Sequence, residues 1–161
     1  MAVDMFIKIG DIEGESKDKG GHEKEIDVLA WSWGMSQSGT THLGTGGGAG
    51  KVSVQDISFT KYIDKSSMNL IIACCNGKHY DEAKLTVRKA GENPLEYLTI
   101  TMKDCLITAV STGGSGGEDR LTENVTINFA QFEAEYKPQK ADGTGDAGVF
   151  AKWDIPGNIK L

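Results

Sequence analysis

Apolar and polar residues alternate with a period of two through most of this chain, which is the pattern of strands that bury one face. The alternation covers residues 3–9, 25–35, 51–62, 82–89, 95–103, 105–112 and 125–136, and a short closing run covers 149–155. Residues 64–76 are typical of a helix, because Asp64 or Ser66 can cap its first N–H groups and Gly77 can end it. Many strands with one helix predict a mainly β fold, a sandwich or a barrel.

Two tryptophans indicate which side of the strand at residues 25–35 is buried. Leu29, Trp31, Trp33 and Met35 share one face, because side chains two positions apart point the same way. Tryptophan adds a large apolar area to any core that receives it. We therefore expect this face to point into the core and Ser32 to point the other way.

A long glycine-rich connection separates two of the expected strands. Residues 34–50 hold seven glycines. Connections in compact domains usually run about four to six residues, so one of this length is normally a lid, a binding arm or a disordered segment. The residues themselves leave these three alternatives open.

Charge and apolar content limit the class of partner. The 161 residues carry a formal net charge of −6, and the lysines are interleaved with acids, which does not suit a phosphate backbone. The first apolar run lacks a cationic leader, and no run approaches the roughly 20 apolar residues of a membrane span. We expect one domain made in the cytoplasm, with no nucleic-acid partner and no membrane insertion. Cys74, Cys75 and Cys105 are expected to be small buried side chains.

Short motifs that imitate catalytic or ligand sites each lack part of their pattern. Lys51 ends the glycine run, but Thr45 and Val52 stand where a phosphate-binding loop needs glycine and a hydroxyl residue. Residues 113–117 match G-x-S-x-G, yet Ser115 would join two strands rather than a strand and a helix. The three histidines lack metal-ligand spacing; they are His22, His42 and His79. We predict no catalytic residue, no cofactor and no metal, with a Ser115 hydrolase as the enzyme alternative.

Five blocks of sequence stand out together: MAVDMFIKIGDIEGES, KEIDVLAWSWGMSQSG, GAGKVSVQDISFTKYIDKSS, GKHYDEAKLTVRKAG and STGGSGGEDRLTENVTINFAQFEAEYKPQ. They resemble the Hcp family, which forms the inner tube of bacterial type VI secretion systems. Five blocks in the expected order are more specific than any short motif. The resemblance runs from residue 1 to about residue 139, and it implies nothing for individual residues from 140 to 161.

The resemblance implies a fold and an assembly. The fold is two packed sheets that form a closed or nearly closed β-barrel, with a flanking helix at about 64–76 and an arm at about 35–50, in a single domain of residues 1–161. Six copies are expected to form a ring with a wide channel. Rings stack into a tube that works with spike, sheath and baseplate proteins. The chain would be secreted without a signal peptide and would carry small effector proteins in its lumen. The alternative is a secreted binding module or effector without a tube role.

Two hypotheses attach this assembly to particular residues. A lid needs an active site to cover, and we predict none. Because the resemblance implies a ring of subunits, we expect the glycine-rich segment to cross a subunit boundary. The residues expected at that interface are Met35, Gln37, Thr40, Thr41, His42, Leu43 and Lys51. Ser32, opposite the tryptophan face, is expected to face the lumen.

Overall fold

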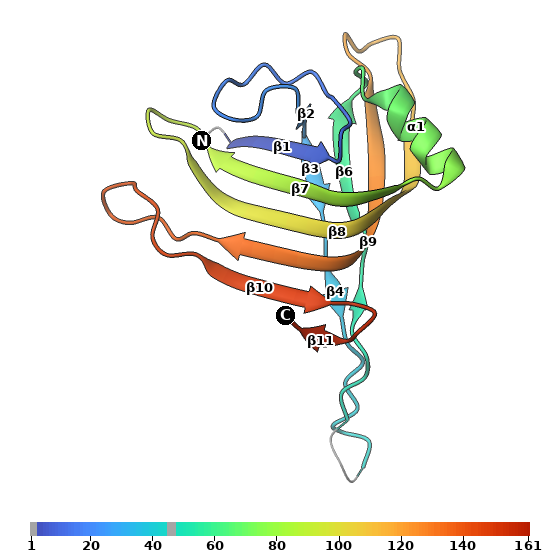
Figure 1. Cartoon of the computed structure of the whole chain (residues 1–161), viewed down its shortest axis with the longest axis vertical. Coiled ribbons are helices and arrows are strands. Elements are labelled where there is room, and N and C mark those ends of the chain that lie inside the picture. The colour runs from blue at the N-terminus through green and yellow to red at the C-terminus, as the bar shows by residue number, and fades with distance from the viewer. Residues whose placement is uncertain (1–2, 45–47) are drawn as a thin grey trace.

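The computed structural model describes residues 3–44 and 48–161, which form antiparallel β-structure and one α-helix (Figure 1). The mainly β prediction is confirmed. In chain order the elements are β1 (Val3–Ile9), β2 (Ile26–Asp27), β3 (Ala30–Ser32), β4 (Met35–Ser36), β5 (Ser53–Val54), β6 (Ile57–Tyr62), α1 (Ser67–Asn76), β7 (His79–Lys89), β8 (Leu95–Thr112), β9 (Thr122–Tyr136), β10 (Val149–Asp154) and β11 (Ile159–Lys160).

A nine-stranded sheet makes the body, and it branches at β9. Its main path runs β11-β10-β9-β8-β7-β1-β2, while β6 pairs with β9 and β3 pairs with β6. The last part of β9 pairs with β10, whereas residues 122–127 pair with β6. Because β8 and β9 are 18 and 15 residues long and curve strongly, they belong to both layers of the body (Figure 1).

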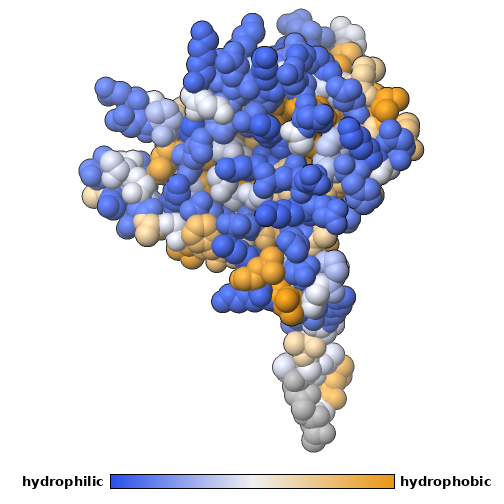
Figure 2. All heavy atoms as spheres, viewed as in Figure 1, coloured by the Kyte–Doolittle hydropathy of each residue, from blue (hydrophilic) through white to orange (hydrophobic). Residues whose placement is uncertain are grey.

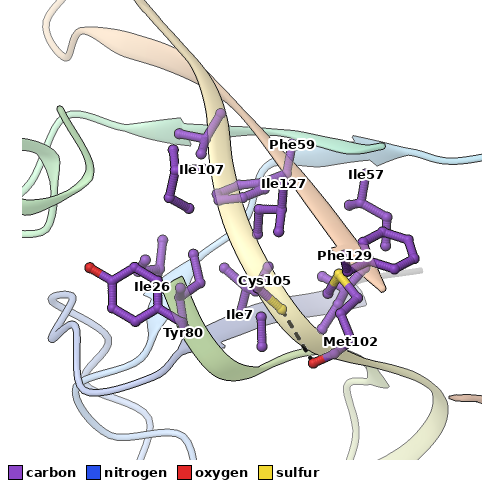
Figure 3. Close-up of a cluster of buried hydrophobic side chains, with 14 of the residues drawn as sticks. Ile7, Ile26, Ile57, Phe59, Tyr80, Met102, Cys105, Ile107, Ile127 and Phe129 are labelled. Carbon is purple, nitrogen blue, oxygen red and sulfur yellow. Dashed lines mark hydrogen bonds between the residues drawn. The ribbon is translucent and has the colours of Figure 1, made fainter. Parts of the chain in front are cut away.

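The core lies between these two layers and follows the predicted alternation. Ile7, Leu85 and Ile100 stand in register on β1, β7 and β8 and are buried. Figure 3 shows side chains from both layers meeting there, including Phe59, Met102, Cys105, Ile127 and Phe129. The Cys105 thiol donates to the Met102 carbonyl at 3.4 Å, and burial raises its pKa to about 12.

One long strand replaces the two predicted at residues 95–103 and 105–112. Asp104 interrupts the alternation with a left-handed φ of 59°, and the register with β9 shifts between Ile107 and Ala109. Irregularities of this kind bend a strand without ending it. The sequence offers no glycine or proline at Asp104, so the alternation alone could not distinguish a bend from a turn.

The segment from Ile26 to Met35 departs from the predicted single strand. Trp31 and Trp33 are half-buried against the core as expected, but Leu29 and Met35 are 39% and 47% exposed. Ile26, on the supposed outer face, is fully buried. The reason is that this segment pairs first with β1, then with β6 and then with β5, so its faces exchange between pairings.

The helix is shorter than predicted and begins at Ser67. Ser66 makes no side-chain cap, and its backbone N–H donates instead to Asp64 Oδ1 at 2.9 Å. Gly77 ends the helix with a left-handed φ of 66°, as predicted. The prediction of buried cysteines is wrong for Cys75, which is exposed. The helix packs through Leu70 and Ala73, and Cys75 lies away from that face.

A buried ionic cluster takes the place of the missing cap. Lys61, at the end of β6, pairs with Glu123 at the start of β9 and with Asp64 at 3.0 Å. Lys61 Nζ also donates to Ser67 Oγ at 3.0 Å, and Ser67 Oγ donates to Glu123 Oε1 at 2.6 Å. The side chains of Lys61 and Glu123 are fully buried. This cluster fixes the first turn of α1 to both β6 and β9.

Candidate functional site

The glycine-rich segment forms a β-ribbon that pairs with itself. Strands β4 and β5 begin the ribbon, and a bridge between Gly39 and Ala49 continues it. Thr40 donates to the Gly48 carbonyl from its backbone N–H at 3.3 Å and from its hydroxyl at 2.9 Å. The ribbon projects from the body along the longest axis of the molecule (Figure 1). The centre of the predicted arm, residues 45–47, lies outside the described residues.

The arm brings together the residues predicted for a subunit interface. All seven are exposed, and among them Leu43 and Met35 present apolar side chains that are 72% and 47% exposed. Figure 2 shows the arm as a narrow projection with apolar side chains among polar ones. Its contact with a second copy stays a prediction.

Ser32 lies on a polar face of the sheet, where Asn128 of β9 donates to the Asp56 carboxylate at 2.8 Å. Ser32, Ser58 and Thr126 are in register across β3, β6 and β9, and Ser58 Oγ lies 3.1 Å from Thr126 Oγ1. In the neighbouring row, Thr60 Oγ1 donates to Asn124 Oδ1 at 2.6 Å. Ser32 is exposed, and its place in a lumen stays a prediction. We did not predict that Ser58 and Thr126 lie beside Ser32. Both are small polar residues at outward-facing positions of β6 and β9, so the alternation could have indicated it.

The motifs that imitate catalytic sites fall in turns and packing contacts. Ser115 lies in the exposed turn between β8 and β9, which is the predicted strand-to-strand context. His22 is buried, with Nδ1 at 3.0 Å from Glu25 Oε2 and Nε2 at 2.6 Å from Glu96 Oε1. Among the residues described, no cluster of three or more His, Cys, Asp or Glu side chains could hold a metal ion.

The loop between β1 and β2 is fastened to the outer face of the sheet by a stack of side chains. The Arg88 guanidinium lies 5.1 Å above the Phe6 ring, and the His22 ring stacks on Phe6 with centroids 4.4 Å apart. Arg88 Nη2 bonds to Asp4 at 3.0 Å and pairs with Asp18 of the loop. The Arg88 hydrogen bond lowers the pKa of Asp18 below its ordinary value.

We expect Arg88→Met to reduce the acid sensitivity of folding. Because Arg88 lowers the pKa of Asp18 in the folded state, the stability that this pairing adds is present at pH 7. It is lost as the pH falls below the ordinary aspartate value of about 3.9. Urea midpoints of the variant and the parent should therefore differ at pH 7 and converge near the acid limit. Arg120→Met, at an arginine stacked on Tyr62 instead, is the control, and an equal pH profile for both variants would contradict the assignment.

None of the helices in the described residues is long and apolar enough to cross a bilayer.

The family model described as "Type VI secretion system effector, Hcp" matches residues 6–136. Protein hcp1 of Pseudomonas aeruginosa is 70% identical over 162 residues, covering 99% of both chains.

Solved structures agree with this match over the full length. The crystal structure of Hcp1 from Salmonella typhimurium has 41% identity and a TM-score of 0.82, with 100% of both chains covered. A structure described as a type six secretion system protein has 26% identity and a TM-score of 0.93, covering 99% of this chain and 100% of that one. The chain therefore belongs to the Hcp family of the type VI secretion system.

Proposed function

We propose that six copies of this chain form a ring, and that rings stack into the inner tube of a type VI secretion system. As a member of the Hcp family, the chain is a secreted component of that system. The observation that carries the assembly is the arm, a projecting ribbon on which Leu43 and Met35 are exposed. Isolated two-stranded ribbons are marginally stable in water, so an arm of this kind gains stability by packing on a neighbour.

We also propose that residues 1–161 form one nearly closed barrel. Supporting this, the backbone N–H of Val28 donates to the Met5 carbonyl at 2.9 Å, and that of Leu29 donates to the Thr60 carbonyl at 2.8 Å. The chain between β2 and β3 thereby links β1 to β6, the two strands that would otherwise leave the barrel open. A barrel removes sheet edges and presents outer faces that can be divided between lumen and neighbours.

The lumen is assigned to the polar face around Ser32. Serine and threonine hydroxyls can hold a polar protein surface weakly, which suits cargo that has to be released. The cargo class is small effector proteins. Spike, sheath and baseplate proteins are the partners proposed for the ends and the outside of the tube.

We expect Ser32→Gln to lower cargo loading while rings still form. The longer side chain protrudes from the Ser32, Ser58 and Thr126 row and blocks close approach of a bound protein. The measurement is the amount of small protein that co-purifies with rings from cells. Ser115→Gln, in an exposed turn, is the control. Loss of rings in Ser32→Gln would assign the residue to packing and remove it from the lumen.

Electron microscopy of the purified protein tests the assembly directly. Six-fold rings with an open centre are expected. Monomers at every concentration examined would overturn the tube function and favour a secreted binding module or effector of the same fold.

A further inference from the structure

The arm has a charge that differs from the rest of the chain. Residues 28–55 contain no aspartate or glutamate, although the whole chain has 23 and a formal charge of −6. The basic or titratable side chains in this stretch are Lys51 and His42. Acidic copies repel one another, and a projecting segment without carboxylates can approach a second acidic copy without that repulsion.

An acidic cleft lies on the outer face of β1 and β7, under the loop that joins β1 to β2. Its volume is about 720 Å³, and five carboxylate residues and three lysines line it. This volume is within the range of about 300–1,000 Å³ that encloses bound groups in proteins. A second cleft, beside Tyr62 and Arg120, is smaller, at about 460 Å³, with three carboxylates against two cations. The larger cleft therefore has the greater excess of negative charge.

Part of the wall of this cleft is built of buried side chains. His22 and Thr86 are buried there, and the ring of His22 is held between Glu25, Glu96 and the face of Phe6. Lys84 of β7 also lines the cleft, in register with Lys8 of β1. A site whose side chains are already fixed loses little freedom when it is filled. The cleft thus has the form of a receptor for a polar or weakly basic segment.

The arm and the cleft lie toward opposite ends of the longest axis. Figure 1 shows the arm projecting from one end, with β1, β7 and the loop above them in the other half of the body. Figure 2 shows a mostly hydrophilic surface over those strands. Two different surfaces placed in this way allow each copy to give one contact and receive the other, which is the rule of heterologous assembly.

We propose that this cleft receives residues 40–43 of the arm from a neighbouring copy. The inference rests on the proposed function, because it names the surface that the arm of one tube subunit reaches on the next. His42 enters among the carboxylates, and Leu43 packs on the aliphatic stems and the Tyr80 ring at the cleft wall. The receptor is thus formed by β1, β7 and the loop before β2.

Disulfide trapping between two different variants tests the proposal. Both carry C74S and C75S, which remove the half-buried and exposed thiols and leave the buried Cys105. One variant adds H42C on the arm, and the other adds K84C in the cleft. A matched control adds K152C, because Lys152 lies in the same row of the same sheet face, beyond Thr101 and Glu133. The variants are mixed, allowed to assemble, oxidised and analysed by non-reducing electrophoresis, with rings examined by microscopy in parallel.

We expect the H42C and K84C variants to form a mixed disulfide dimer, and the H42C and K152C variants to form little. Equal trapping at both positions would overturn the proposal. Rings without trapping at K84C would also overturn it while leaving the tube function standing. Absence of rings in the parent protein would remove the proposed function and this inference together.

Discussion

Lys61→Met is expected to lower the free energy of unfolding by about 3–5 kcal/mol, because it leaves buried charge without a partner. Glu123 is fully buried, and its Oε2 already lacks a hydrogen-bond partner. Removing the ammonium group leaves Glu123 Oε1 with only the Ser67 hydroxyl and leaves Asp64 with only its bonds from Ser66. Methionine keeps most of the length of lysine, so the loss arises from charge rather than from a cavity. Urea denaturation followed by circular dichroism measures it.

Two further variants separate this effect from ordinary loss of a lysine. Lys65→Met removes an exposed partner of Glu13 at 3.0 Å and should change stability little, since exposed pairs contribute little. The double variant Lys61→Met, Glu123→Leu should regain much of the lost stability, because apolar replacements of a buried pair are often neutral. If Lys61→Met behaves like Lys65→Met, the cluster does not stabilise the fold as described.

Replacing residues 41–48 by Asn-Gly is expected to abolish assembly while the body keeps its thermal stability. The pair Asn-Gly favours a tight hairpin turn, and the bridge between Gly39 and Ala49 lies just outside the replaced segment. The segment removed includes the exposed Leu43, and among its described residues Leu43 and Gly48 hydrogen-bond to Thr40 of the arm. The expected result is a fall from ring mass to monomer mass in light scattering, with an unchanged melting temperature.

A shortened turn elsewhere provides the matched control. Residues 113–117 are also uncharged, rich in glycine and exposed, but they join β8 to β9 at the edge of the body. Replacing them with Asn-Gly should leave the mass of the ring unchanged. Rings of normal mass and stability in the arm variant would show that the arm does not cross a subunit boundary.

Period-two alternation was sufficient to place most strands and much of the core. It succeeded for Ile7 and Ile9 on β1 and for Val125, Ile127 and Phe129 on β9, which are all buried. It succeeded on β1 because that strand keeps one partner on each side, and at Val125 and Ile127 because residues 122–127 of β9 stay between β6 and β8. It was wrong for Leu29 and Met35, where the segment changes partner within a few residues. The two-residue strand β11 is too short to leave a periodic signal at all.

The same alternation held a signal for the buried ion pair that we did not use. Lys61 stands at an inward position two residues after Phe59, and Glu123 stands at an inward position two residues before Val125. Opposite charges at inward positions of two strands indicate a buried pair, because neither charge is stable there alone. Arg88 offered no such signal. It lies on the outer face of β7 and is buried by a loop whose position the sequence does not specify.

The length of β8 and β9 also determines the order in which the body can form. These strands are neighbours along the chain and pair along their lengths, so their hairpin closes with little loss of chain entropy. Strand β1 must find β7, and β6 must find β9, across long intervening sequence, and such non-local pairing is slow. Until β1 and β6 arrive, the hairpin has open edges that could pair with another chain. The long β8–β9 hairpin that curves the body therefore has a consequence for folding. A newly made chain has to complete its sheet quickly, before the open edges of two hairpins pair with each other.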